Sequence, residues 1–544
     1  MNTDQSLATV LPKQPGKTTK RLHLDGDSAL PSVDIMLPCC GEPLDIILDT
    51  IRAVCVMDYP QSAFRVLVLD DGNSIELRQA VEELHNTWPN LLYDSRGTKP
   101  SQKVYSKAGN LNYAIFEVQG KMSNPPDFIA GFDSDFLPTP NFLRATLPHL
   151  LEDQNVGLVG PFQDFYNLPP GDPLAQSLEV YRELVLPNLN ERGSSLATGS
   201  GYVMRRQLAI DVGGFPTINE VDDMTLSVIL TSYGKRVVAL YEMLQFGRVP
   251  ASLEGHVRQR RRWITGGTQM LATPWTAPKD SIPHASRIHL SLIGAMMIWS
   301  LLNQSVGCAI IGPALMSGQP LLPGIMPKLQ IVLSLITFGF VWLYEWLKSA
   351  VTGFRLATFA HMNDLWMCTD RLLTSIRFHL FGSQAGRVLV TGSAQNSWNN
   401  PNKIPTRASQ LKGDLWDSGV GYNVLFIIAA LTGMTYSAMY SIESKSGWQS
   451  HAMTTLLCPP AFFMCYITLS CHIIPVLCVI WPPHYPSREA VFETHPSDPR
   501  AVFPSERVRQ HNVRQKVKPL GIRGHSLLFP VYLTLMATFY FLYL

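Results

Sequence analysis

Two closely spaced acids follow an apolar run in the first half of the chain, where a buried strand would end. Asp133 and Asp135 close the run DFIAGFDSD, with one small residue between them. On an extended backbone alternate side chains point the same way, so both carboxylates can face one cation. Mg²⁺ or Mn²⁺ takes such oxygens and keeps other positions for phosphate oxygens. The pair therefore predicts a divalent metal site; a solvated turn is the alternative.

A second acidic pair, Asp70 and Asp71, ends the run FRVLVLDD and precedes a glycine. Such a turn can seat a nucleoside, with a carboxylate accepting hydrogen bonds from uracil or ribose. The alternative is a plain Asp-Gly turn. No GxGxxG follows the first apolar run, which argues against a nicotinamide-binding Rossmann domain.

Two further segments offer groups for a nucleotide and an acceptor. In KAGNLNYA (107–114), Lys107 could meet phosphate charge and Asn110 could hydrogen-bond the nucleotide; a capped helix with an exposed lysine is the alternative. Glu220, Asp222 and Asp223 open an amphipathic helix. The helix dipole alone could explain one of these acids. A carboxylate here could also act as general base on an incoming hydroxyl.

The stretch HVRQRRRWITGG (256–267) places four arginines within five residues, followed by Trp263. Arginine binds phosphate oxygens bidentately and keeps its charge, so it could stabilise a departing diphosphate. The tryptophan face could hold a sugar ring or the end of the acceptor. Taken alone, however, a basic cluster before a membrane helix favours anchoring or contact with anionic lipid.

The elements that would position these residues form two halves. The first half alternates helical spacing (44–56, 74–88) with short apolar runs typical of a parallel sheet covered on both faces. The predicted strands are 33–38, 64–71, 127–135, 156–162 and 235–242. We therefore expect a doubly wound, Rossmann-like α/β domain with its ligand beyond the carboxyl ends of the strands.

The second half predicts a membrane bundle. Each of five apolar stretches is long enough to span a bilayer: about 288–312, 329–349, 420–441, 453–481 and 526–544. Prolines in the fourth predict a kink or break. Residues 354–382 have the spacing of a helix lying in the membrane surface, with packing against the first domain as the alternative. The basic segment 482–524 orients the first half and the basic loops to the cytosol and the C-terminus outside.

Composition favours membrane-buried surface and gives no support to a nucleic-acid partner. Charged residues make up 16% of 544 residues, below the soluble norm, and the net charge is only +2. The polar first thirty residues show no cleavable signal peptide. The nine cysteines form no CxxC pair, which predicts reduced thiols.

The order of these motifs resembles the membrane-integrated family 2 glycosyltransferases, which include cellulose, chitin and hyaluronan synthases. Asp-Asp-Gly, KAGNLN, Asp-Ser-Asp, TGSG, Val-Asp-Asp and QRRRW follow one another and precede the membrane helices. The resemblance covers roughly residues 32–400 and implies a GT-A domain on a transmembrane bundle. Processive synthesis of a β-linked glycan with export, from UDP-glucose as a first guess, is the activity it favours.

The resemblance also implies residue roles. Asp223 matches the general base, and Asp135 and Arg262 complete the catalytic set. The donor-binding residues would be Asp70, Asp71, Lys107, Asn110, Gln259, Arg262 and Trp263. Asp133 and Asp135 would hold Mg²⁺ or Mn²⁺. Thr198 to Gly201 would lie near the acceptor, and VLVTGS (388–393) resembles a gating loop.

Departures from the family pattern concern secretion more than sugar transfer. Val221 and Asp222 replace Thr-Glu before the base, and Val388 stands where the gating loop has phenylalanine. Transfer of a single sugar to a lipid or hydrophobic metabolite is therefore the alternative, and a non-catalytic membrane scaffold is a third class. The expected boundaries are a flexible segment 1–30, the GT-A domain 31–283, a transmembrane hairpin 284–350, an interfacial and gating segment 351–412, a second hairpin 413–481, the basic cytosolic loop 482–524 and a final helix 525–544.

Overall fold

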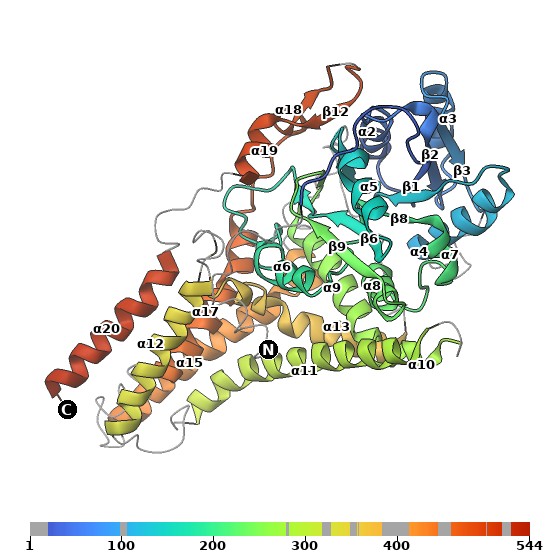
Figure 1. The fold of residues 1–544 in the computed structure, drawn as a ribbon. Helices are drawn as coiled ribbons and strands as arrows, with labels where there is room; N and C mark the ends of the chain where they lie inside the picture. Colours follow the sequence, from blue (N-terminus) through green and yellow to red (C-terminus); the bar gives the residue numbers. More distant parts are fainter. Residues whose placement is uncertain are drawn as a thin grey trace.

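The computed structural model describes residues 20–97, 106–278, 282–317, 328–348, 356, 358–382, 413–443, 459–496, 498–513 and 524–543. An α/β domain forms one end of the molecule, and a bundle of long helices extends from it (Figure 1). The gating-loop-like segment 388–393 and most of the predicted flexible segment 1–30 lie outside the described residues.

A seven-stranded sheet forms the centre of the first domain, in the order β3-β2-β1-β4-β8-β6-β9. Its strands are β1 (Val33–Cys39), β2 (Phe64–Asp70), β3 (Leu91–Asp94), β4 (Phe128–Gly131), β6 (Val156–Pro161), β8 (Tyr202–Arg205) and β9 (Arg236–Leu240). All five predicted strands are present. The third is shorter than predicted, because the strand ends at Gly131 and not at Asp135.

Strand β8 makes the sheet mixed where a parallel sheet was expected, since it pairs antiparallel with both β4 and β6. The chain leaves β6 at Pro161 at the edge where the strands end, and re-enters the sheet from that same edge at Tyr202. A strand that starts there must run in the opposite direction. The four-residue run YVMR has no alternating pattern that would predict it. Its entry places Thr198–Gly201 beside the acidic motifs.

Alternation along the strands builds two cores, one on each face of the sheet. Ile35 and Val66 pack into the core beneath helices α2 (Leu44–Cys55), α3 (Ile75–His85) and α5 (Phe142–Glu152). Met36 and Leu67 point to the opposite face, beneath α4 (Ser106–Tyr113), α7 (Arg206–Asp211) and α8 (Asp222–Ser232). Helices on both faces confirm the doubly wound arrangement (Figure 1).

Smaller elements complete this domain. A three-stranded sheet in the order β5-β10-β7 lies beside it, formed by Phe136–Pro138, Gln245–Gly247 and Asp164–Phe165. A short helix, α6 (Leu186–Glu191), precedes β8. Strand β5 begins directly after Asp135, so the small sheet is continuous with the predicted metal motif.

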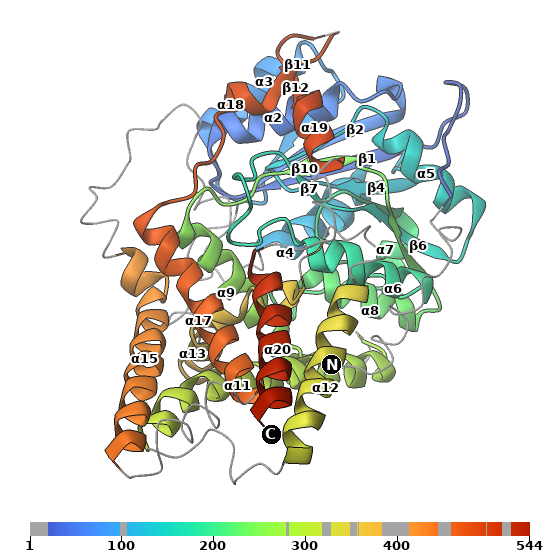
Figure 2. The same ribbon diagram turned by 90° about the vertical axis from the view of Figure 1, so that its left-hand side faces the viewer.

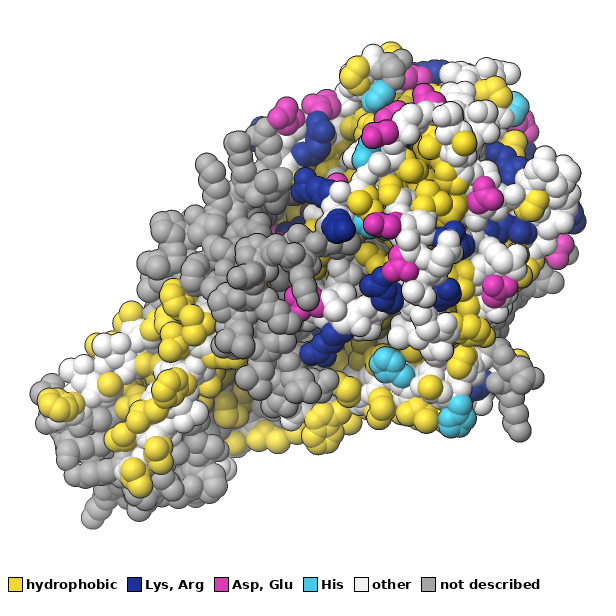
Figure 3. Space-filling view, in the orientation of Figure 1, with side chains coloured by type: hydrophobic (Ala, Val, Ile, Leu, Met, Phe, Trp, Pro, Cys, Tyr) yellow, Lys and Arg dark blue, Asp and Glu magenta, His cyan; other side chains and the backbone are white. Residues whose placement is uncertain are grey.

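Long helices follow α9 (Leu253–Gln269) and the one-turn α10 (Thr273–Thr276). They are α11 (His284–Met316), α12 (Lys328–Lys348), α13 (Cys368–Phe381), α15 (Val420–Glu443), α17 (Pro459–Ile480) and α20 (Gly524–Tyr543). Hydrophobic side chains cover α11 along the lower edge of the face in Figure 3. They include the exposed Leu292, Met296 and Trp299, and such an apolar face fits a lipid environment.

Helices occupy all five predicted spans. Within the described residues three of them, His284–Met316, Val420–Tyr440 and Phe462–Ile480, are long and apolar enough to cross a membrane. The topology of five spans stays a prediction. The described part of the fourth span, α17, is helical from Pro459 to Ile480 with Pro475 inside it, and residues 453–458 lie outside the described residues; the predicted kink or break stays a prediction.

The predicted surface helix 354–382 is shorter than expected. Phe359 has a left-handed backbone, φ 61°, and two 3₁₀ turns precede α13. Helix α13 packs against α9, because Asp370 pairs with Arg261 and His379 contacts Thr268. Its other side exposes Leu380 and Phe381. The contacts with α9 favour the alternative, packing against the first domain, and a position in the membrane surface stays a prediction.

The basic segment after α17 folds back over the α/β domain, beside α2 (Figures 1 and 2). It contains α18 (Arg488–Val491), the antiparallel strands β11 (Phe492–Thr494) and β12 (Val502–Pro504), and α19 (Glu506–Val513). We call residues 488–509 the strap.

Candidate active site

The Asp-Ser-Asp motif lies in a turn between β4 and β5, so the extended geometry expected for Asp133 and Asp135 is wrong. The turn is held from two sides. The backbone N–H of Asp133 donates to Ser200 Oγ at 3.1 Å. The hydroxyl of Thr50, on α2, donates to the carbonyl of Ser134 at 2.8 Å. Hydrogen bonds from other elements, and not strand alternation, therefore set the direction of these carboxylates.

Lys107 joins the predicted motifs at one point. Its Nζ donates to Asp133 Oδ1 and to the carbonyl of Gly199, each at 2.5 Å. Burial opposes the ammonium charge, but Asp133, Asp222 and Asp223 outweigh it and raise the pKa of Lys107. The lysine sits in the first turn of α4, as the sequence predicted. One cation thus lies among three carboxylates from two separate motifs.

Asp222 and Asp223 form the first turn of α8, and Asp223 lies against the Gly199 loop. A Cβ at Gly199 would sit 2.9 Å from Asp223 Oδ2, and its φ of +87° also requires glycine. Burial, together with the charge of Asp222 and against the opposing effect of Lys107, raises the pKa of Asp223 to about 6. Burial also raises the pKa of Asp222. Such a carboxyl can accept a proton near neutral pH.

The arginines of α9 point to different partners, because each helical residue is turned about 100° from the last. Arg261 pairs with Asp370 of α13. Arg260 is buried over the ring of Trp263, 4.5 Å from its centroid, and burial lowers its pKa to about 10. Only part of the cluster is therefore available to a ligand.

Arg262 faces the acids. Its charge lowers the pKa of Glu220 and Asp222, although burial leaves the pKa of both raised. Within the described part of the chain its Nε is buried without a hydrogen-bond partner. A Cβ at Gly266, one helical turn on, would lie 2.8 Å from Val221, so α9 packs closely on the start of α8. Gln259 lies three positions before Arg262 and four before Trp263 on α9, and residues three or four positions apart share a helix face.

Both carboxylates of the Asp-Asp-Gly turn accept hydrogen bonds from other groups of the protein. Asp70 accepts hydrogen bonds from the N–H groups of Gly72 and Ser74, both at 2.7 Å, and from the hydroxyl of Tyr93 at 2.9 Å. Asp71 makes a bidentate pair with Arg96 at 2.6 and 2.5 Å. A nucleoside contact by either aspartate requires it to exchange or share these partners.

Asn110 connects this turn to α4. Its amide donates to the carbonyl of Leu69 at 2.7 Å, and its Oδ1 is buried without a partner among the described residues. Asn110 therefore holds the end of β2 beside the helix that carries Lys107. The observed hydrogen bond of Asn110 is thus a structural one, and it lies at the edge of the sheet where the nucleotide is predicted to bind.

Two residues near the site were missed from the sequence. Arg96, which pairs with Asp71, belongs to no motif and lies beyond β3. Glu42 follows β1, and its carboxylate accepts the N–H of Cys40 at 2.5 Å. Burial raises the pKa of Glu42, and Asp133 raises it further. The rule that singled out the other acids, a carboxylate after an apolar strand, would also have found Glu42.

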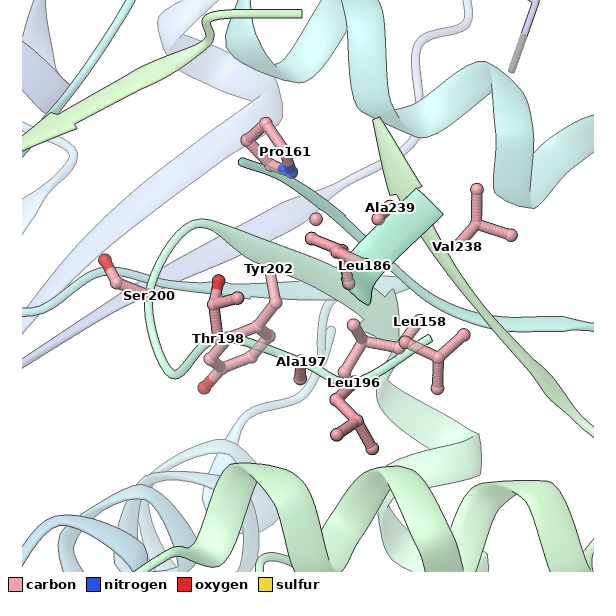
Figure 4. A pocket seen from close by; sticks show the side chains of 12 residues that line it. Leu158, Pro161, Leu186, Leu196, Ala197, Thr198, Ser200, Tyr202, Val238 and Ala239 are labelled. Atoms are coloured by element: carbon pink, nitrogen blue, oxygen red, sulfur yellow. The ribbon is translucent and has the colours of Figure 1, made fainter. Parts of the chain in front are cut away.

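The small cavity in Figure 4 lies beside the site. Thr198, Ser200 and Tyr202 line one side, and aliphatic side chains such as Leu186 and Leu196 line the other. Its volume of about 10 Å³ holds no more than one water molecule. A sugar nucleotide cannot enter it.

The carboxylates of the Asp-Ser-Asp turn fit a divalent cation that is shared with phosphate. No group of three metal-ligating side chains lies together in the residues that the structure describes. Mg²⁺ and its chemical relatives, however, are often held by one or two carboxylates plus substrate phosphates. Asp133 already accepts a cationic group, the ammonium of Lys107. The donor set thus suits a cation that arrives with a nucleotide diphosphate.

Comparison with known proteins identifies the first domain. Residues 31–266 match the family model described as Glycosyltransferase like family 2, so this segment is a family 2 glycosyltransferase domain. The chain is 29% identical over 262 residues to the cellulose synthase catalytic subunit (UDP-forming) of Xanthomonas axonopodis pv. citri, covering 46% of this chain and 34% of the relative. It is 30% identical over 255 residues to the Pseudomonas fluorescens subunit, covering 45% and 32%. The chain thus spans about a third of the length of these relatives.

The chain also aligns in part with solved structures. A mannosyltransferase from Pyrobaculum calidifontis in complex with GDP-Man and Mn²⁺ has a TM-score of 0.45 at 18% identity, covering 70% of this chain and 95% of that one. A TarS fragment from S. aureus in complex with UDP has a TM-score of 0.31 at 14% identity, covering 64% and 91%. The first domain of this chain has the expected GT-A-like mixed α/β fold, and apolar helices follow it.

Proposed function

We propose that this chain is an inverting glycosyltransferase that transfers a hexosyl unit from a UDP-sugar to a growing β-linked polysaccharide and couples the transfer to export through its membrane helices. UDP-glucose is the first candidate donor. The observation that carries the proposal is the convergence of Lys107, Asp133 and Asp223 at one end of the sheet, beside Arg262. The similarity to UDP-forming cellulose synthase subunits supports the class of donor and product.

Asp223 is the proposed base. The acceptor hydroxyl attacks the anomeric carbon on the face opposite UDP, and Asp223 takes its proton. The raised pKa suits this step, because a carboxylate with a pKa of about 6 is ionised at pH 7 yet basic enough to share a proton in the transition state. Attack from the opposite face converts an α-linked donor into a β-linked product.

Lys107 and Arg262 are the proposed stabilisers of the leaving group. As the bond to the sugar breaks, negative charge grows on the diphosphate, and fixed cations at that position lower the barrier. When bound at Asp133 and Asp135, Mg²⁺ or Mn²⁺ would supply further positive charge to the phosphate oxygens. Asp70, Asp71, Asn110 and Gln259 would surround the nucleotide, and Trp263 would contact the sugar or the acceptor end.

The test measures release of UDP by the purified full chain in lipid nanodiscs. A panel of UDP-glucose, UDP-N-acetylglucosamine and GDP-mannose is offered with Mn²⁺ or Mg²⁺, and the product is sized after radiolabelling. We expect UDP release from one UDP-sugar and a polymeric product. Discrete small glycolipids would replace the polymerase with single transfer to a lipid or hydrophobic acceptor. No release from any donor would refute the proposed activity.

A further inference from the structure

The strap touches the α/β domain beside the Asp-Ser-Asp turn, far along the chain from it. Arg488 forms a bidentate pair with Asp49 of α2, at 2.6 and 3.2 Å. The Asp49 side chain is only 4% exposed. A nearly buried charge pair that loses one partner leaves the other uncompensated, so this contact constrains where α2 lies.

Helix α2 passes this constraint to the proposed metal motif. Thr50, the residue after Asp49, donates its hydroxyl to the carbonyl of Ser134, between Asp133 and Asp135. The hydroxyl and the carbonyl are both buried. One hydrogen bond therefore separates the residue next to the strap's ion pair from the turn that carries the two carboxylates.

An apolar contact reaches the same turn from its other end. Leu137 of β5, two residues after Asp135, belongs to a buried cluster with Val491, Val502 and Phe503 of the strap. The rings of Phe492 and Tyr166 pack with centroids 4.8 Å apart. The strap thus contacts α2, which holds the turn through the Thr50 hydroxyl, and β5, the strand that follows the turn.

The strap is also continuous with a membrane helix. Helix α17 ends at Ile480, and Arg488 follows eight residues later. Between them the hydroxyl of Tyr485 donates to Gln176 Oε1 at 2.9 Å, and Gln176 in turn donates to the carbonyl of Pro250, just before α9. A displacement of α17 would therefore act on α2 through Arg488 and on the start of α9 through Gln176.

We propose that Arg488 is a positioning residue: through Asp49 and Thr50 it holds the Asp133–Asp135 turn in its metal-binding geometry and ties that turn to membrane helix α17. This inference rests on the proposed function, since it takes the turn to hold a divalent cation with the donor diphosphate. Arg488 itself touches neither substrate nor metal. Losses of ten- to a hundredfold in metal affinity or activity are typical when such supporting contacts are removed.

The test compares Arg488→Gln with Arg500→Gln in the full chain in nanodiscs. Arg500 lies on the same strap, but it pairs with Asp498 and stacks over Trp88, 5.0 Å from the ring centroid, away from the turn. Binding of Mn²⁺ in the presence of UDP is measured by electron paramagnetic resonance, together with kcat and the Mn²⁺ concentration for half-maximal activity. We expect Arg488→Gln to weaken Mn²⁺ binding about tenfold and Arg500→Gln to leave it unchanged.

Two further variants separate positioning from a general loss of folding. Thr50→Val keeps the shape but removes the hydroxyl, and it should reproduce the weaker Mn²⁺ binding with the strap intact. The double exchange Asp49→Arg with Arg488→Asp should recover part of the loss. Wild-type Mn²⁺ affinity in both Arg488→Gln and Thr50→Val, or an equal loss in Arg500→Gln, would overturn the inference. If the wild-type chain releases no UDP, the proposed function fails, while the Mn²⁺ binding comparison still tests the inference.

Discussion

The aspartates that follow β2 and those that follow β4 differ in how the protein compensates their negative charge. At the end of β2, Asp70 accepts three hydrogen bonds, and Asp71 accepts two from the guanidinium of Arg96. Groups of the protein therefore stabilise both carboxylates. Beyond β4, Lys107 pairs directly with Asp133, while Asp222 and Asp223 lie in the field of the same lysine and have raised pKa values. Excess negative charge is expensive in a partly buried place. These carboxylates therefore favour binding of a further cation, or uptake of a proton from a substrate.

This contrast assigns different work to the two ends. The β2 end is a preformed scaffold, and its changes should affect stability or donor affinity. The β4 and α8 end carries the chemistry in the proposed function, so its changes should affect the turnover rate.

The largest effect is expected from Asp223→Asn. The amide keeps the shape but cannot take the acceptor proton, so kcat should fall by about 10²–10⁴-fold. Affinity for UDP with Mn²⁺ should change little, which calorimetry can check. The matched variant Asp71→Asn should reduce kcat far less, and equal losses in kcat would erase the contrast.

Arg262→Gln should come next, with a loss in kcat of about 10²-fold, because it removes a charge proposed to act on the departing diphosphate. Arg261→Gln is the neighbour control, since Arg261 pairs with Asp370 and points away from the acids. Initial rates of UDP release compare the two. Similar rates for both variants would show that the cluster acts only as a membrane anchor.

Arg96→Gln should act on stability and not on chemistry. The Arg96 and Asp71 side chains are 9% and 8% exposed, so loss of the arginine leaves a nearly buried carboxylate without its charged partner. We expect a loss of about 1–3 kcal/mol in unfolding free energy, seen as a lower Tm, with kcat close to wild type. A large loss of kcat at unchanged Tm would place Arg96 in the catalytic machinery.

The smallest effect is a shift in pH dependence. The base works ionised, so kcat/KM should rise with pH through about 6, the pKa of Asp223. Asp222→Asn removes a charge that raises this pKa, and the acidic limb of the profile should therefore move to lower pH. A limb that stays in place, or moves upward, would mean that Asp223 is not the titrating base.

Much of the first domain could be predicted from residue pattern. Short apolar runs such as Val33–Cys39 and Phe64–Asp70 formed strands, because helices cover both faces of the sheet and both sets of alternating side chains are buried. The start of α8 at Asp222 followed from acids preceding a helical pattern. These signals are local, and local signals are visible in one sequence.

Other features depended on contacts between distant segments. The turn at Asp133–Asp135 replaced an expected extended strand because Thr50 and Ser200 hold its backbone. Strand β8 lacked its own periodicity and is defined by the two strands it joins. Arg96 and Arg488 pair with aspartates far along the chain, and neither carries a motif. Tertiary partners, and not composition, decide such positions.

Calorimetric titration of UDP into the full chain, with and without Mn²⁺, tests most directly whether the acids at the end of β4 hold a nucleotide diphosphate through a cation. We expect wild-type protein to bind UDP tightly only with Mn²⁺, and Asp133→Asn to lose this dependence while it keeps its Tm. Equal UDP binding with and without Mn²⁺ in both proteins, or no binding in either, would contradict this expectation.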